Sequence, residues 1–134
     1  MGVMNDSHAI VRGLYAALEG GDVPGFFAGF APGIVWNEAE GNVLAHGNPY
    51  TGGEAIAAGV FGRLLAEWAD FRVEVGEVVG GPEVVTMLGR YHAQHTTSGK
   101  TLDVQCAHTW WLEGGKVVRF QQMVDTLALA EAAR

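Results

Sequence analysis

The apolar residues near the start of the chain recur every three or four positions, which is the spacing of one face of an α-helix. Over residues 8–19 this stripe consists of Ile10, Val11, Leu14, Tyr15 and Leu18. Asn5, Asp6 and Ser7 are candidate N-caps, and the pair Gly20-Gly21 is a typical helix end. The pattern therefore predicts an amphipathic helix over residues 8–19.

Two further helices are predicted before the chain changes its periodicity. A short one follows Asp22, with Pro24 in the first turn, where a missing N–H does no harm. Another is expected from Thr51 to about residue 69, because Thr51 and Glu54 resemble a capping box. Its apolar positions are Ile56, Val60, Leu64 and Trp68. Between these two helices, residues 32–39 indicate a first strand, followed by a Gly- and Asn-rich loop that could include a short strand.

From Phe71 onward the apolar residues alternate with polar ones, which is typical of β-strands. Four strands are predicted, at about 71–79, 84–97, 101–113 and 116–125. Each break between them is short and contains glycine, as β-hairpins require. The order helix, helix, strand, helix and four-stranded antiparallel meander predicts a single α+β domain covering residues 1–134.

The inward faces of these strands are apolar except at a few positions. Alternation places His95, His108 and Gln122 on inward faces, and in the last strand Val118 is expected to face the same way as Gln122. In the first strand, Glu38 shares a face with Trp36. An unpaired buried polar group costs on the order of 1–3 kcal/mol, so these groups must meet each other, water or a ligand. An apolar cavity with a few convergent polar groups is the usual form of a small-molecule site.

Charge and composition narrow the possible partners. The net charge is −7 with only eight Lys and Arg residues, and no basic cluster occurs. Binding to nucleic acid or to an anionic membrane is therefore not expected. Cys106 is the single cysteine, which precludes an intrachain disulfide. Because the start "MGVMNDSHAIV" has neither a basic segment nor a long apolar core, we expect a cytoplasmic protein.

Glu38 and His108 are the main candidates for chemistry, and each has an alternative interpretation. Glu38 is either a pocket carboxylate whose pKa is raised by desolvation beside Trp36, or a rim carboxylate that lies in water or is bonded to loop amides. His108 is either a donor to a substrate oxygen or a core histidine satisfied by the backbone or by Glu38. Together with His95 they form a possible metal-ligand set, but no close-spaced motif supports one, so we expect no metal. Glu40 is expected at the surface.

Several segments also resemble one known group of proteins. The element order, the "GD" at 21–22, "VWNEAEG" at 35–41, "CAHTWW" at 106–111 and "GGKVVRFQQMVD" at 114–125 are similar to the nuclear transport factor 2-like superfamily. Within it the chain resembles the branch of ketosteroid isomerase, limonene-epoxide hydrolase and the SnoaL-like polyketide cyclases. The resemblance implies a cone-shaped, cystatin-like α+β barrel, with three N-terminal helices packed in the concave face of a curved, mainly antiparallel sheet. It also implies homodimerisation through the outer sheet face.

The resemblance assigns roles to individual residues. Glu38 matches the general base of ketosteroid isomerase, and His108 matches the acid of its oxyanion hole. Leu14 matches the first-helix tyrosine of that enzyme, with Tyr15 one residue away and turned by ~100°. Gln122 falls near the catalytic aspartate of the hydrolases and cyclases. Asp125 lies on the opposite face, where a structural role is expected.

The expected ligand is a small hydrophobic molecule, and its predicted contacts line the cone. They are Leu14, Tyr15, Trp36, Tyr91, His95, Trp110, Phe120 and Gln122. One hypothesis is a cofactor-independent isomerase, cyclase or hydrolase acting on a carbonyl or epoxide, with Glu38 as base and His108 as donor. The alternative is a non-catalytic module of the same fold that binds a hydrophobic ligand or a partner protein.

Overall fold

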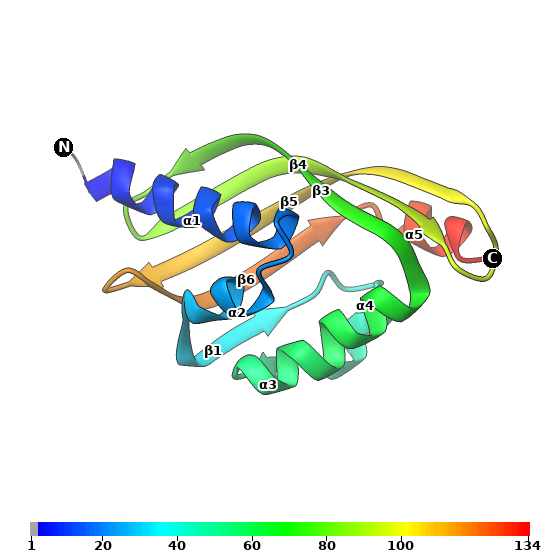
Figure 1. The fold of residues 1–134 in the computed structure, drawn as a ribbon, viewed down its shortest axis with the longest axis horizontal. Helices are drawn as coiled ribbons and strands as arrows, with labels where there is room; N and C mark the ends of the chain where they lie inside the picture. The colour runs from blue at the N-terminus through cyan, green and yellow to red at the C-terminus, as the bar shows by residue number, and fades with distance from the viewer. Residues whose placement is uncertain (1–2) are drawn as a thin grey trace.

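The computed structural model describes residues 3–134, with side chains from residue 6 onward. Its helices are α1 (Val3–Glu19), α2 (Val23–Ala28), α3 (Gly53–Ile56), α4 (Gly62–Glu67) and α5 (Thr126–Ala132). A 3₁₀ turn, η1 (Val43–Gly47), and a π-helical turn, η2 (Ala57–Phe61), complete the helical segments. The strands are β1 (Phe30–Asn37), β2 (Tyr50–Thr51), β3 (Trp68–Gly80), β4 (Val84–His95), β5 (Thr101–Glu113) and β6 (Lys116–Val124). This is the predicted α+β fold (Figure 1).

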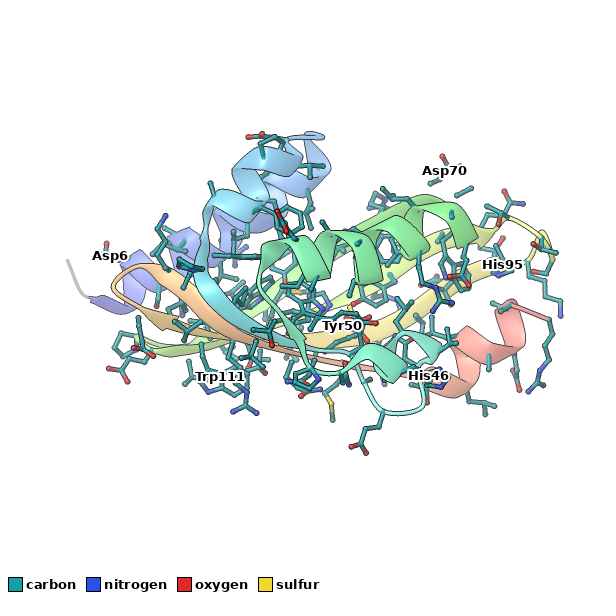
Figure 2. All side chains as sticks on the ribbon, turned by 90° about the horizontal axis from the view of Figure 1, so that it is seen from below. Asp6, His46, Tyr50, Asp70, His95 and Trp111 are labelled. Atoms are coloured by element: carbon teal, nitrogen blue, oxygen red, sulfur yellow. The ribbon has the colours of Figure 1, made fainter. Side chains whose placement is uncertain are left out.

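The strands form one curved, open sheet in the order β2-β1-β6-β5-β4-β3. All neighbouring pairs are antiparallel except β1 and β6. Helices α1 to α4 cover one face of the sheet, and Trp111 lies on the opposite face (Figure 2). The four long strands confirm the predicted meander, and the short strand β2 confirms the one suggested within the loop.

The first helix begins earlier than its pattern predicts. Asp6 and Ser7 lie inside α1, so the prediction that residues 5–7 cap the helix is wrong. The physical reason is that Ser7 is four residues before Val11 and continues the buried stripe by one turn: its side chain is buried. The second helix is as predicted, because the Asp22 carboxylate accepts from the backbone N–H of Gly25 at 3.0 Å.

The third predicted helix is present but differs at its ends and in the middle. Its N-cap is Gly52, with a positive φ of 85° and no capping side chain, whereas Thr51 lies in β2. The capping-box prediction is therefore wrong. The middle turn is π-helical, and the helix ends at Glu67, two residues before the expected end. A π turn has no sequence signature that periodicity could detect, since it changes the hydrogen-bond register of only one turn.

Two strand details also depart from the alternation. Strand β1 ends at Asn37, so Glu38 and Ala39 follow the strand, and both side chains are buried. In β6 the inward residue is Val117, which is fully buried, rather than Val118. A register shift at Trp111 and Leu112 pairs Leu112 with Val117 and moves the start of the strand by one residue.

The C-terminal helix α5 was not predicted. The side chain of Asp125 caps it by accepting from the N–H of Ala128 at 3.1 Å, which confirms a structural role for this residue. An acidic residue followed by an Ala- and Leu-rich segment is a signal that could have indicated this helix. Among residues 3–134, none of the helices has the length and apolar character needed to cross a lipid bilayer. The cytoplasmic location stays a prediction.

Candidate functional site

Two adjoining cavities lie between the helices and the concave face of the sheet. The inner cavity has a volume of ≈ 40 Å³ and is lined by residues of α1, α2, η2 and α4 and of the strands β1, β3, β4, β5 and β6. The outer cavity, of ≈ 170 Å³, extends toward η1 and the C-terminal helix α5. Five residues border both of them: Glu38, Leu64, Phe71, Tyr91 and Gln122. About 150 Å³ of apolar space is enough for a benzene molecule, so the outer cavity can hold one six-membered ring.

Glu38 is an acid held inside this pocket. Its side chain is 2% exposed, which excludes the alternative of a rim carboxylate in water. The indole N–H of Trp36 donates to one carboxylate oxygen at 2.8 Å, and the amide of Asn42 donates to the other at 3.3 Å. Burial raises the pKa of Glu38 to about 7, and the two N–H donors oppose this shift. The carboxyl group therefore exchanges its proton near neutral pH, as a general base must.

Asn42 and Gln122 connect Glu38 to the sheet. The side-chain oxygen of Gln122 accepts from the backbone N–H of Ala39 and from the amide of Asn42, both at 3.1 Å. The side-chain oxygen of Asn42 accepts from the backbone N–H of Leu44 at 3.1 Å. Because a backbone N–H can only donate, these contacts define which end of each amide is oxygen. The NH₂ group of Gln122 then faces Tyr91 and donates to its hydroxyl at 2.9 Å.

His108 lies between two tyrosine hydroxyls. Its Nδ1 is 2.6 Å from the hydroxyl of Tyr15, and its Nε2 is hydrogen-bonded to the hydroxyl of Tyr91. The indole N–H of Trp110 donates to Tyr15 at 2.9 Å. Burial lowers the pKa of His108 to about 3, so the ring is neutral at neutral pH. Burial also raises the pKa of both tyrosines well above the usual value, so both keep their protons.

These contacts join into one buried hydrogen-bond network. In order it consists of Trp36, Glu38, Asn42, Gln122, Tyr91, His108, Tyr15 and Trp110. Within the described residues, no fully buried side-chain nitrogen or oxygen lacks a hydrogen-bond partner. The expectation that the inward polar groups meet one another is therefore confirmed for Glu38, Gln122 and His108. Glu38 and His108 also border the same inner cavity.

Aromatic rings form much of the rest of the inner wall. Trp36 stacks on Phe120 with ring centroids 3.7 Å apart, and Trp110 contacts Phe120 at 4.6 Å. The tilted Trp110–Phe120 pair has one of the favoured arrangements for aromatic rings. The stacking leaves the indole N–H of Trp36 directed at Glu38, so the apolar wall also orients the carboxylate.

Most predicted contact residues border the cavities, but not all do so in the expected way. Leu14 is buried in the core and is not among the residues that line either cavity. Tyr15, one position on, borders the inner cavity despite its offset along the helix. His95 is separate from the network. It borders the outer cavity, where its ring is edge-on to Trp68 and its Nδ1 accepts from the N–H groups of Thr97 and Ser98.

Sequence reasoning missed Asn42 and the residues of α5. Asn42 lies in a Gly- and Asn-rich loop, and its position next to a predicted pocket acid was the only available signal. Glu40 is exposed, as expected. Burial raises the pKa of the Cys106 thiol to about 12, which agrees with an unreactive cysteine. Between residues 3 and 134, no three His, Cys, Asp or Glu side chains gather closely enough to hold a metal ion.

A comparison with family models identifies the group. The model of the SnoaL-like domain matches residues 11–120, which is most of the chain. The chain belongs to this family. Its solved structural neighbours carry the same fold: an NTF2-like protein from Burkholderia thailandensis E264 is 32% identical, with a TM-score of 0.90 over 96% of this chain and 97% of that one. The predicted membership of the NTF2-like superfamily is therefore confirmed.

Two more distant structural neighbours were crystallised with small molecules. TerC, co-crystallised with polyporic acid, is 21% identical, with a TM-score of 0.84 over 96% of this chain and 98% of that one. A protein with a ketosteroid isomerase-like fold from Catenulispora acidiphila DSM 44928, in complex with trimethylamine, is 19% identical, with a TM-score of 0.77 over 92% and 91%. At these identities the likeness shows the fold alone. A search of curated proteins gave no match.

Proposed function

We propose that this SnoaL-like protein is a cofactor-independent acid–base catalyst for a small, largely apolar carbonyl compound. Glu38 removes a proton from the carbon next to the carbonyl group, and a hydroxyl of the His108 end of the network stabilises the oxygen that becomes negative. The observation that supports this proposal is one buried acid, with a pKa of about 7, on the same cavity as two tyrosines whose hydroxyls bond His108. The volume of the cavities favours a compact substrate.

The role of His108 changes in this proposal. Both of its ring nitrogens are already bonded to tyrosine hydroxyls, so the imidazole acts on the ligand through them. We therefore place a tyrosine hydroxyl between His108 and the substrate oxygen. Hydrogen-bond donors aimed at a developing oxyanion are among the strongest contributions to catalysis in a dry site.

The alternative is a pocket that binds a small hydrophobic molecule without chemistry. Gln122 supports it, because an amide held by the N–H of Ala39 cannot accept a proton as the aspartate of the cyclases does. The small molecules crystallised with TerC and with the Catenulispora protein are compatible with either function. The two functions differ in whether a carbon-bound proton is exchanged.

The deciding experiment uses cyclohexanone as the probe in D₂O. Enolisation replaces its α-hydrogens by deuterium, which NMR follows directly. We expect the wild-type protein to exchange deuterium faster than buffer alone. In Glu38→Gln we expect the exchange rate to fall by roughly 10²–10⁴-fold. Glu40→Gln is the matched control, since it alters an exposed acid two residues away. If cyclohexanone binds without exchange, or if Glu38→Gln retains full exchange, Glu38 is not the base.

We also propose that the protein forms a homodimer through the outer face of the sheet. Leu88, Ala107 and Met123 are register neighbours across β4, β5 and β6. Leu88 is 45% and Met123 is 60% exposed, so the row presents apolar surface. Sedimentation analysis should give a dimer for the wild type and a monomer for Met123→Glu. Leu65→Glu, an exposed leucine on the helical side, is the control. A monomeric wild type contradicts this assignment.

A further inference from the structure

The hydrogen-bond network contains one more hydroxyl proton than its nitrogen and oxygen atoms can accept. At the two tyrosines, the donor of each hydrogen bond from outside the Tyr15–His108–Tyr91 group is known. Gln122 donates its amide N–H to the oxygen of Tyr91, and the indole N–H of Trp110 donates to the oxygen of Tyr15. An indole nitrogen cannot accept, and the amide cannot be turned without placing its NH₂ group against the N–H of Ala39. Each tyrosine oxygen therefore already receives one hydrogen bond from outside the pair.

His108 lies between these two oxygens and, when neutral, carries a single N–H. If the proton is on Nδ1, the ring donates to Tyr15 and accepts the hydroxyl proton of Tyr91. If the proton is on Nε2, the ring donates to Tyr91 and accepts the hydroxyl proton of Tyr15. In either case one tyrosine accepts two hydrogen bonds, and its own O–H proton has no nitrogen or oxygen acceptor in the network. For Tyr91, the sulfur of Cys106 lies within hydrogen-bond reach, but a thiol sulfur is a weak acceptor that a ligand oxygen can replace. A protonated His108 ring would donate from both nitrogens, and then neither tyrosine hydroxyl proton would have a nitrogen acceptor. At least one hydroxyl proton is therefore left over in either protonation state of His108.

The two arrangements are not equivalent with respect to the cavities. Tyr91 borders both the inner and the outer cavity, whereas Tyr15 borders the inner one only. Tyr91 also lies near enough to Glu38 for the carboxylate charge to raise its pKa. The side chain of Tyr91 is 4% exposed, so bulk water does not reach its hydroxyl freely. A donor at Tyr91 is therefore placed beside the acid and next to the larger space.

We propose that Tyr91 donates its hydroxyl proton to an acceptor oxygen of the bound ligand, while His108 holds its own proton on Nε2 and Tyr15 donates to Nδ1. This deepens the proposed function, on which its catalytic meaning rests, because it names the donor and the ligand chemistry. Tyr91 then accepts from Gln122 and from His108, and both of its lone pairs are used. The site consequently selects a carbonyl or enolate oxygen and rejects a ligand that presents an N–H or O–H at this position.

The first test measures the carbonyl stretching frequency of cyclohexanone bound to the protein by infrared difference spectroscopy. Donation by Tyr91 lowers this frequency relative to cyclohexanone in a hydrocarbon solvent. We expect the shift to be lost in Tyr91→Phe and retained in Tyr15→Phe and Tyr50→Phe. Tyr50 is the matched control, because its hydroxyl donates to the backbone carbonyl of Leu44 instead. A shift that survives Tyr91→Phe, or no shift and no saturable binding in the wild type, overturns the proposal.

The second test needs no variant and no ligand. The ¹⁵N resonances of His108 in the labelled wild-type protein distinguish a protonated from an unprotonated ring nitrogen. We expect Nε2 to carry the proton, and a proton on Nδ1 would overturn the assignment to Tyr91. Deuterium exchange of cyclohexanone separates this inference from the proposed function. A carbonyl shift without exchange supports the donor and rejects the catalyst, whereas exchange without a shift supports the catalyst and rejects the donor.

Discussion

Glu38 and His108 stand toward opposite ends of the same buried network, but their neighbours are of different kinds. Glu38 is surrounded by N–H groups that can only donate, from Trp36 and Asn42. His108 is surrounded by two hydroxyls, each of which can donate or accept. At the Glu38 end, the carboxyl group is the one group that can gain or lose a proton, because the N–H groups of Trp36 and Asn42 keep theirs. At the His108 end, protons can rearrange while every heavy atom stays in place.

Because of this difference, the Glu38 end can remove a proton and the His108 end can stabilise an oxyanion. A single acidic residue could not do both. The carboxyl group changes its charge near neutral pH because its neighbours stabilise the ionised form only in part against burial. The imidazole stays neutral, and its surroundings can present a hydroxyl proton to a ligand oxygen without a net change of charge. The first arrangement suits proton removal, and the second suits the stabilisation of an oxyanion.

The largest expected effect concerns the His108 end and acid stability. Between pH 6.5 and about 3 the unfolded chain binds a proton at His108 that the folded protein does not. Stability therefore falls as the pH decreases through this window, by roughly 5 kcal/mol in total. Urea unfolding at a series of pH values should show this loss in the wild type and a flatter acid limb in His108→Gln. Identical acid limbs would mean that His108 titrates normally in the folded protein.

The next effect has the opposite sign and belongs to Glu38. Between pH 4.5 and about 7 the folded protein keeps a proton that the unfolded chain has lost. Its contribution is complete below pH 4.5 and is lost as the pH rises through the folded pKa, a change of about 3 kcal/mol. The same unfolding series in Glu38→Gln should lack this decline. If the variant and the wild type decline together, the raised pKa belongs to another group.

A smaller effect is expected on the pKa of Glu38, and it compares a side chain that bonds the carboxyl group with one that bonds the backbone of the same residue. Asn42→Ala removes an N–H donor from Glu38, and we expect the pKa of Glu38 to rise by roughly one unit. Asn48→Ala is the control, because Asn48 bonds the backbone N–H and carbonyl of Glu38. The ¹³C chemical shift of the Glu38 carboxyl group, measured against pH, gives its pKa in each variant. Equal shifts in the two variants would contradict a direct role of Asn42.

The smallest effect lies outside both ends, at the helix beside the outer cavity. Asp125→Ala removes the N-cap of α5 and should cost about 1 kcal/mol of stability. Since Leu129 and Ala133 of this segment line the outer cavity, cyclohexanone affinity should fall a few-fold by calorimetric titration. The pKa of Glu38 should not move, because α5 makes no contact with its carboxyl group among the hydrogen bonds of the described residues. A shifted pKa would mean that the helix sets the solvation of the acid.

Much of the site was predictable because strand alternation is a strict rule. Alternation alone predicts that His108 and Gln122 face inward, and the odd–even pattern of β5 holds along its whole length. It also paired Glu38 with Trp36, although Glu38 lies after the strand. The rule failed at Val117 and Val118, because a bulge shifts the register and leaves no local mark in the sequence. Caps were less predictable, since Ser7 and Thr51 suit several local conformations.

By itself, the sequence determined the α+β class, the order of the main elements up to β6 and most of the residues that turn inward, because periodicity follows from local backbone geometry. Only the tertiary structure decided which inward polar groups touch. The hydroxyl of Tyr15 reaches His108 across 93 positions of sequence, and Gln122 reaches Asn42 across 80. The same packing raises the pKa of Glu38 and lowers that of His108, because desolvation depends on the atoms that surround a group and not on its neighbours in sequence.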